Sequence, residues 1–214
     1  FHLYAIDALQ PGAKARDLTP FKGAKAQNVE TNKRFPDQLL VGINKRDPTQ
    51  FDMYRCQLST GELTLDTENP GDVLGWGTED ESFEVREAVV MNPADSSTTV
   101  RVRDDAKSEW RELITFPYGE EGNMVEFSKD GKSALVLSSI GRETTALVRL
   151  DLKSGKVLEE IAASDKCNVG GLQIDEDTKE VQAVAFNYAR LERTFFDLSL
   201  IHISEPTRRY AISY

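Results

Sequence analysis

One strand–turn–strand pattern occurs four times along the chain, and this repeat limits the possible folds more than any other feature of the sequence. The copies begin about 47 to 50 residues apart, a spacing typical of repeated supersecondary units. A glycine marks the turn in three copies, and Lys107-Ser108 occupies it in the other. The copies are Leu3–Thr19, Met53–Asn69, Val100–Phe116 and Leu147–Ala163, with Gly12, Gly61 and Gly155 at the turns.

A second kind of hairpin alternates with the first. Asp-Gly and similar pairs favour the positive φ values that tight hairpin turns require. Each repeat therefore contains four short strands, and no window has the apolar periodicity of an amphipathic helix. The turn segments and the apolar runs that follow them are Phe35–Gln38 before Leu39–Ile43, Trp76–Glu81 before Phe83–Val90, Phe127–Lys132 before Ala134–Leu137, and Asp175–Lys179 before Val181–Phe186.

We therefore predict an all-β fold, a partial β-propeller of about four four-stranded antiparallel blades that belong to a larger, here unclosed ring. A β-sandwich is the structural alternative, but it does not require the same turn at the same phase four times. An unclosed ring exposes apolar blade faces and strand edges, so we expect the isolated chain to associate or to be poorly soluble. The expected units are a half blade at Phe1–Thr19, full blades at Pro20–Asn69, Pro70–Phe116 and Pro117–Ala163, and a final piece at Ser164–Asp197.

The last seventeen residues resemble a translated laboratory oligonucleotide. Leu198–Arg208 reads LSLIHISEPTR, and its back-translation matches a transposon-type sequencing adapter in frame. Ile212–Tyr214 matches the constant adapter sequence that follows a variable index. We interpret residues 198–214 as a non-native tail to be excluded from fold reasoning, and residues 1–197 as an incomplete propeller domain truncated at both ends.

The balance of charges limits the classes of partner. The chain has 26 Lys and Arg against 36 Asp and Glu, a formal charge of −10, which disfavours nucleic acid. No run approaches the ~18 apolar residues of a membrane helix, and no basic segment followed by an apolar one opens the sequence. Two cysteines cannot form a disulfide scaffold, and two histidines leave little for a metal site. We expect no membrane partner and no cofactor, with a cytoplasmic location as the default.

Several segments resemble one enzyme family. Phe127–Leu137 reads FSKDGKSALVL and is similar to the WD40-like, TolB-type propeller repeat. With His2–Ala8, Asn44–Leu63 and Val169–Gly171, in this order, the chain resembles the N-terminal propeller of prolyl oligopeptidase family (S9) serine peptidases. The resemblance implies a C-terminal α/β-hydrolase domain with a Ser-Asp-His triad, and a propeller that restricts access to short peptides. The alternative is a non-enzymatic TolB-like propeller that binds proteins or ligands.

The catalytic residues of that family are not found in this sequence. No GxSxG nucleophile elbow occurs in the sequence. In Gly131-Lys132-Ser133, for example, Leu135 stands where the second glycine is required. His2 is the only histidine outside the tail that could act as a general base. We therefore assign no catalytic, cofactor-binding or metal-binding residue and place the chemistry in the expected hydrolase domain.

Other candidate motifs have plainer structural interpretations. We expect Gly131-Lys132-Ser133 to be a hairpin turn rather than a phosphate loop, and Gly75-Trp76-Gly77 to be a loop rather than a dinucleotide fingerprint. Some dipeptidyl-type relatives hold a substrate's amino terminus with a propeller glutamate pair, but here we interpret Glu120-Glu121 as a solvated loop.

The remaining candidates are charged, sulfur-containing and aromatic residues. We expect Arg46-Asp47 to be a turn-locking ion pair in a loop, with a contact to the hydrolase domain as the alternative. The others are interpreted as surface or turn carboxylates (Glu79-Asp80-Glu81 and Asp104-Asp105), free thiols (Cys56 and Cys167) and blade-packing residues (Trp76 and Trp110).

Overall fold

The computed structural model describes residues 1–197, and the tail predicted at residues 198–214 lies outside the described part. The described chain consists of β-strands and turns and contains no helix. Its strands form three four-stranded sheets, one three-stranded sheet and one two-stranded sheet, all antiparallel. The strands are β1 (Tyr4–Ala5), β2 (Arg16–Asp17), β3 (Ala26–Thr31), β4 (Gln38–Asp47), β5 (Gln50–Gln57), β6 (Leu63–Thr67), β7 (Val73–Glu79), β8 (Glu84–Met91), β9 (Thr98–Val102), β10 (Arg111–Phe116), β11 (Gly122–Phe127), β12 (Ser133–Ser138), β13 (Ala146–Asp151), β14 (Val157–Ala162), β15 (Val169–Ile174), β16 (Val181–Asn187) and β17 (Leu191–Phe195).

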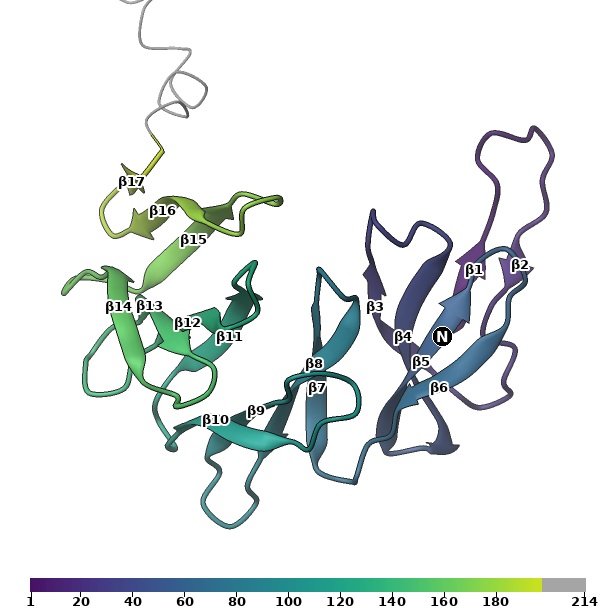
Figure 1. Cartoon of the computed structure of the whole chain (residues 1–214), viewed down its shortest axis with the longest axis horizontal. Helices are drawn as coiled ribbons and strands as arrows, with labels where there is room; N and C mark the ends of the chain where they lie inside the picture. The colour runs from purple at the N-terminus through teal and green to yellow at the C-terminus, as the bar shows by residue number, and fades with distance from the viewer. Residues whose placement is uncertain (198–214) are drawn as a thin grey trace, which may run out of the picture. The chain divides into compact units, whose positions relative to one another are not determined.

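Strands that are consecutive in the sequence are neighbours in each sheet, so every sheet is an up-and-down meander (Figure 1). The sheets β3–β6, β7–β10 and β11–β14 coincide with the three predicted full blades. The pair β1–β2 is the predicted half blade, and β15–β17 is the predicted final piece. The all-β, partial-propeller prediction is therefore confirmed.

The strands of a blade differ in burial, and this difference explains their sequences. The central strand β12 is almost wholly buried and reads as a continuous apolar run. The outer strand β14 is mostly exposed and carries Glu159 and Glu160. Charged side chains on an edge strand discourage pairing with another chain.

The chain forms two compact units, Phe1–Tyr118 and a second that begins at Gly119. The first unit contains β1 to β10 and has two apolar clusters. One lies between the β1–β2 region and the first full blade, and the other between the first and second full blades. Their buried members are Leu18, Leu39, Val41, Ile43, Tyr54 and Cys56 in the first cluster, and Leu40, Met53, Trp76, Phe83, Val85 and Ala88 in the second.

The second unit contains β11 to β17 and has a core that joins its two sheets. The buried members of this core are Leu135, Leu147, Val169, Val181 and Val184. An ion pair of 3.1 Å between Lys179 Nζ and Glu126 Oε2 links the β15–β16 hairpin to β11. Each unit therefore packs blade against blade, as successive propeller blades do.

The turn predicted at Trp76–Glu81 is misplaced. Strand β7 continues to Glu79, and the turn follows it. The Glu79 carboxylate accepts hydrogen bonds from the backbone nitrogens of Glu81 and Ser82, at 2.8 and 2.9 Å, and so defines where the chain reverses. Gly75-Trp76-Gly77 therefore lies within a strand, and the expectation of a loop there was wrong.

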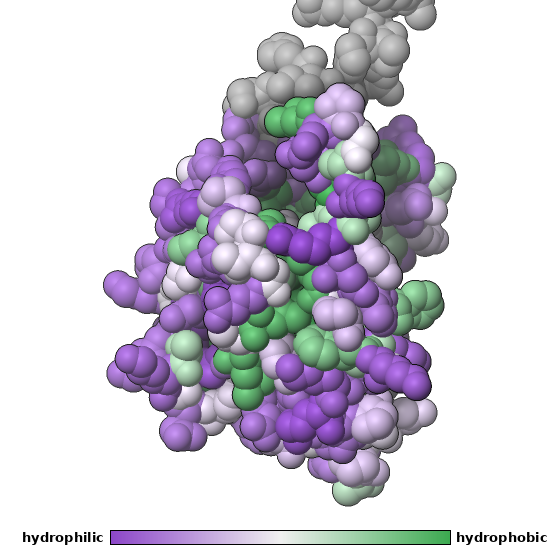
Figure 2. Space-filling model, turned by 90° about the vertical axis from the view of Figure 1, so that its right-hand side faces the viewer, coloured by the Kyte–Doolittle hydropathy of each residue, from purple (hydrophilic) through white to green (hydrophobic). Residues whose placement is uncertain are grey.

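Apolar side chains reach the surface at the start of the chain. Phe1, Tyr4, Ile6 and Leu9 are 90%, 59%, 61% and 94% exposed. Figure 2 looks at the side of the molecule where Figure 1 places β1 and β2, and it shows apolar atoms among hydrophilic ones. Within residues 1–197, no helix has the length and apolarity needed to cross a bilayer.

Candidate functional site

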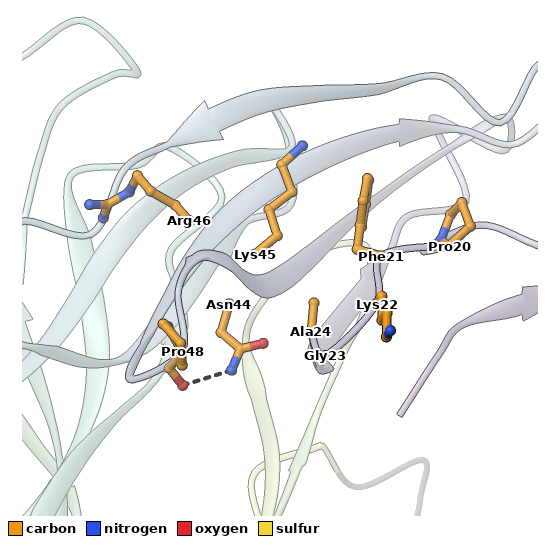
Figure 3. A pocket seen from close by; sticks show the side chains of 9 residues that line it. All are labelled: Pro20, Phe21, Lys22, Gly23, Ala24, Asn44, Lys45, Arg46 and Pro48. Carbon is orange, nitrogen blue, oxygen red and sulfur yellow. Dashed lines mark hydrogen bonds between the residues drawn. The ribbon is translucent and has the colours of Figure 1, made fainter.

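The segment Asn44–Pro48 forms a charged corner at the end of β4. A register shift between Ile43 and Asp47 bulges this strand, which redirects the side chains in between. Asn44 Oδ1 accepts a hydrogen bond of 2.5 Å from the Lys25 backbone nitrogen, and Asn44 Nδ2 donates one of 2.8 Å to the Pro48 carbonyl (Figure 3). The Asn44 side chain thus fixes the β4–β5 hairpin against the segment that leads into β3.

Arg46 is held by a fully buried carboxylate. Its Nε and Nη2 atoms donate to the two oxygens of Asp52 at 3.0 and 2.8 Å, and Nη2 also donates to the Asn69 carbonyl at 2.8 Å. The hydrogen bonds to Asp52 raise the pKa of Arg46 above its ordinary value. Such a bidentate pair compensates the cost of burying the carboxylate.

The sequence predicted Asp47 as the partner of Arg46, and this was wrong. Asp47 Oδ1 instead accepts hydrogen bonds from the backbone nitrogen and the hydroxyl of Thr49, at 2.8 and 2.7 Å. These hydrogen bonds lower the pKa of Asp47. Both residues also belong to β4 rather than to a loop.

The Asp52 network extends to the next blade. Asn69 donates its backbone N–H to Asp52 at 2.8 Å and its side-chain amide to the Val73 carbonyl at 2.8 Å. Trp76 Nε1 donates to the Phe51 carbonyl at 2.9 Å, so the indole ties β7 to β5. The sequence did not single out Asp52 or Asn69, although Asn-Pro at positions 69 and 70 is a turn signal.

Trp110 and Arg103 complete the packing around Trp76. The two indole rings lie 5.9 Å apart at a tilt of 45°, and the Arg103 guanidinium lies 4.6 Å from the Trp110 ring. Arg103 Nη2 also donates to Thr67 Oγ1 at 2.8 Å. Both tryptophans therefore pack between blades.

A hollow of about 620 Å³ opens beside the Asn44–Pro48 corner (Figure 3). The Lys45 ammonium lies over two aromatic rings, 4.5 Å from the centre of Phe21 and 4.7 Å from that of Tyr54. Such cation–π contacts hold a lysine in place without neutralising its charge. The lining residues are Pro20, Phe21, Lys22, Gly23, Ala24, Asn44, Lys45, Arg46 and Pro48.

In the second unit, Glu120-Glu121 lies between β10 and β11, just before β11 begins. The Glu120 carboxylate accepts a hydrogen bond of 2.5 Å from the Ser139 hydroxyl. The Glu121 backbone nitrogen donates to the same hydroxyl oxygen at 2.8 Å, and its carboxylate accepts from Asn168 Nδ2 at 3.2 Å. The pair lies in a loop, as expected, and Glu121 is exposed. Both side chains also take part in a polar network with Ser139 and Asn168.

The other candidate motifs occupy turns and surfaces. Gly131 has a φ of +64° in the β11–β12 hairpin. The Asp104 carboxylate pairs with Arg111 at 2.8 Å, and Asp105 Oδ1 accepts from the backbone nitrogens of Lys107 and Ser108, at 2.8 and 2.9 Å. Within residues 1–197, no three His, Cys, Asp or Glu side chains are grouped so that they could hold a metal ion. Cys56 is buried and free, and Cys167 is free and partly buried.

His2 has an acidic partner. Its Nδ1 atom lies 2.6 Å from Asp17 Oδ2, and this hydrogen bond lowers the pKa of the Asp17 carboxyl. The contact is of the kind that orients a catalytic imidazole, but both side chains lie at the exposed edge of the β1–β2 pair. A nucleophilic hydroxyl with hydrogen-bonding geometry to His2 is absent from the described residues.

Comparisons with known proteins agree with this architecture. No protein-family model matches the chain. The chain is 35% identical over 197 residues to dipeptidyl aminopeptidase BIII of Pseudoxanthomonas mexicana, a match that covers 90% of this chain and 27% of that protein. The chain thus spans about a quarter of the curated relative.

Two solved structures share the fold at low sequence identity. TolB from Acinetobacter baumannii matches 91% of this chain and 45% of its own, with a TM-score of 0.58 and 13% identity. An oligogalacturonate lyase solved with manganese matches 92% of this chain and 57% of its own, with a TM-score of 0.55 and 18% identity. The chain is therefore a partial propeller whose sequence is similar to a segment of a dipeptidyl aminopeptidase.

Proposed function

We propose that this chain is part of the propeller domain of an S9-type serine peptidase and that the catalytic α/β-hydrolase domain lies outside the given sequence. The observation that carries the proposal is the 35% identity to a dipeptidyl aminopeptidase. The matched segment is 27% of that protein, so most of the relative lies outside it. The absence of a GxSxG motif from this sequence agrees with chemistry that resides elsewhere in the parent protein.

The function that we propose for the domain is steric. A ring of blades over an active site admits flexible peptides through its channel and excludes folded proteins. This role requires blades that resist separation. The hydrogen bonds from Trp76 Nε1 to the Phe51 carbonyl and from the Asn69 amide to the Val73 carbonyl join two successive blades and support such rigidity.

Hydrolysis of a dipeptidyl p-nitroanilide tests the assignment of chemistry. We expect the longer gene product to release p-nitroaniline and the isolated chain to release none. A longer product whose GxSxG serine is replaced by alanine is the control for a contaminating peptidase. Turnover by the isolated chain, or no turnover by the longer product, would contradict the proposal.

The gating role needs a separate measurement. The longer product should cleave a short peptide and leave the same cleavage sequence intact when it lies within a folded protein. Equal cleavage of the two substrates would argue against a steric filter.

The alternative is a non-enzymatic propeller that binds proteins or ligands. The structural similarity to TolB supports the fold that this alternative requires. The two sequences are 13% identical, so the similarity supports the fold alone. The natural gene sequence downstream of Asp197 distinguishes the two. A GxSxG motif there supports the peptidase, and further blades followed by a stop codon support the binding module.

A further inference from the structure

The first strands of the two full blades in the first unit expose no charged side chain. These strands are β3 and β7. Charged residues make up 29% of the chain and are normally concentrated on its surface, so their absence from exposed positions is informative. The exposed residues of the two strands are Gln27, Asn28, Val29, Thr31 and Leu74.

The first strands of the second unit have the same property. In β11 and β15 the exposed residues are Asn123, Gly170 and Gln173. None of the four first strands contains a lysine, an arginine, an aspartate or a histidine. The pattern therefore recurs in every described sheet of three or four strands.

The three glutamates in these strands are withdrawn from the exposed surface. Glu79 is buried and its carboxylate caps the turn after β7. Glu126 is half-buried and forms its ion pair with Lys179. Glu30 is half-buried, and burial together with the charge of Asp80 raises the pKa of its carboxyl, which favours the neutral form.

Charge is present elsewhere on the same blades. The last strands β10 and β14 expose Glu112, Glu159 and Glu160. Charged residues also stand directly before three of the four first strands, so the uncharged surface ends where these strands begin. The residues in these positions are Lys25 before β3, Asp72 before β7 and Glu121 before β11.

The first strands lie on the inner side of the blades. In the first unit β7 lies close to β3 and β5 of the preceding blade, whereas the last strands β6 and β10 make no such approach. The Asn32 side chain donates a hydrogen bond of 2.8 Å to the Asp80 carbonyl, and Arg34 forms an ion pair with Glu81. Both contacts join the turn after β3 to the turn after β7. Because propeller blades surround a central channel, the strands at which they converge line it.

We propose that β3, β7, β11 and β15 form an uncharged wall of the channel through which substrate peptides pass, so that the channel selects peptides by width and not by charge. The inference rests on the proposed function, because the passing molecule is the peptide that the parent peptidase hydrolyses.

The side chains of this wall suit a passage rather than a binding site. A cleft lined by charges of one sign concentrates ligands of the opposite sign and repels the others. Gln27, Asn123 and Gln173 instead offer amide groups, which donate to or accept from a peptide backbone without carrying a net charge. Val29 and Leu74 add apolar contacts. Such a wall neither retains nor rejects a peptide because of its charge.

Eight-residue peptides that differ only in their last two residues test the inference in the longer gene product. Lys, Gln or Glu in these positions changes the charge of the peptide far from the cleaved bond. We expect the wild type to hydrolyse the three peptides with kcat/KM values within about threefold of one another. Gln27→Glu places a carboxylate on the wall with almost no change of shape. It should slow the Glu peptide about fivefold relative to the Lys peptide, and less so at high salt.

Thr64→Glu is the matched control, because it adds the same charge at an exposed position of β6, the last strand of the same blade. It should leave the ratio of the two kcat/KM values unchanged. Gln173→Glu on β15 repeats the test in the other unit, so the inference is still tested if Gln27→Glu fails to fold.

A neutral dipeptidyl p-nitroanilide separates this inference from the proposed function. If the longer product releases p-nitroaniline but both glutamine variants keep the wild-type ratio for the charged peptides, only this inference fails. A wild type that prefers one peptide charge by more than about tenfold would also overturn it, as would an equal effect of Thr64→Glu. If no p-nitroaniline is released at all, the proposed function fails and the inference fails with it.

Discussion

At the scale of single residues, Glu87 is the clearest case of a side chain whose chemistry is set by its burial. It lies on β8 opposite Gly77 of β7. A Cβ atom at Gly77 would approach the Glu87 Cβ to 2.9 Å, so the glycine leaves room for this side chain. Burial raises the pKa of Glu87 from 4.5 to about 7.

This raised pKa predicts a stability change between about pH 4.5 and 7. Below that window the Glu87 carboxyl is neutral in both states and costs nothing. As the pH rises through it, the unfolded chain releases the proton first, so the folded state loses stability until the penalty is complete above pH 7. One pKa unit corresponds to about 1.4 kcal/mol. Because Glu87 is partly exposed, solvent screening reduces the energy that corresponds to its full pKa shift. Glu87→Gln should therefore raise the free energy of unfolding by about 2 kcal/mol at pH 8.

Urea unfolding of the wild type and Glu87→Gln at several pH values measures this difference. Glu112→Gln, at an exposed site on β10 of the same sheet, is the control and should show no such trend. A difference between wild type and Glu87→Gln that stays constant from pH 4 to 8 would mean that Glu87 does not titrate in this window.

The residue scale is also where prediction from the sequence failed. Arg46 and Asp47 are adjacent, and adjacency suggested a pair. The bulge in β4 instead directs Arg46 to Asp52 on the next strand. In the same way, glycines at 75 and 77 suggested a loop, although Gly77 serves a contact with Glu87 across the strand pair. Both errors concern contacts that depend on register, which local sequence does not specify.

At the scale of elements, the hairpin turns repeat one geometry. In four of them the first residue accepts a hydrogen bond from the residue four positions later, which has a positive φ. This residue is Gly61, Ser96, Gly155 or Lys179, with φ values of +77°, +58°, +66° and +60°. The hairpins were predictable because turn chemistry is local and recurs in phase with the repeat.

The same geometry predicts opposite effects for two substitutions. Ser96→Gly relieves a left-handed conformation that costs a side chain about 1 kcal/mol, but it adds entropy to the unfolded chain, so a net gain of about 0.5 kcal/mol is expected. Gly61→Ala should destabilise by about 1 kcal/mol. The cause would be backbone strain rather than crowding, because a Cβ there would lie 3.7 Å from Arg16, an ordinary contact. Urea midpoints that shift in the same direction for both variants would contradict this account.

At the scale of the whole molecule, the number and order of sheets followed from the repeat period, since each period had to contain one meander of four strands. The polar contacts between blades did not follow, because Trp76 of β7 and the Phe51 carbonyl of β5 come together only when the sheets pack. A sequence repeat thus specifies what each blade is, and the few residues that join blades are specified by packing.

The exposed apolar start of the chain predicts association between copies. Tyr4 and Ile6 lie on and beside β1, a two-residue strand paired only with β2 among the described strands. Burying such surface against a second molecule is favourable by about 25 cal/mol per Å². Sedimentation velocity should therefore show a mass that rises with protein concentration, and the double variant Tyr4→Lys/Ile6→Lys should shift it toward the monomer.

Leu158→Lys is the control variant. It replaces a leucine that is 59% exposed on β14 and should leave association unchanged, because its neighbours Glu159 and Glu160 already protect that edge. A wild type that stays monomeric at all concentrations would show that the exposed residues of the β1 region are too few to drive contact.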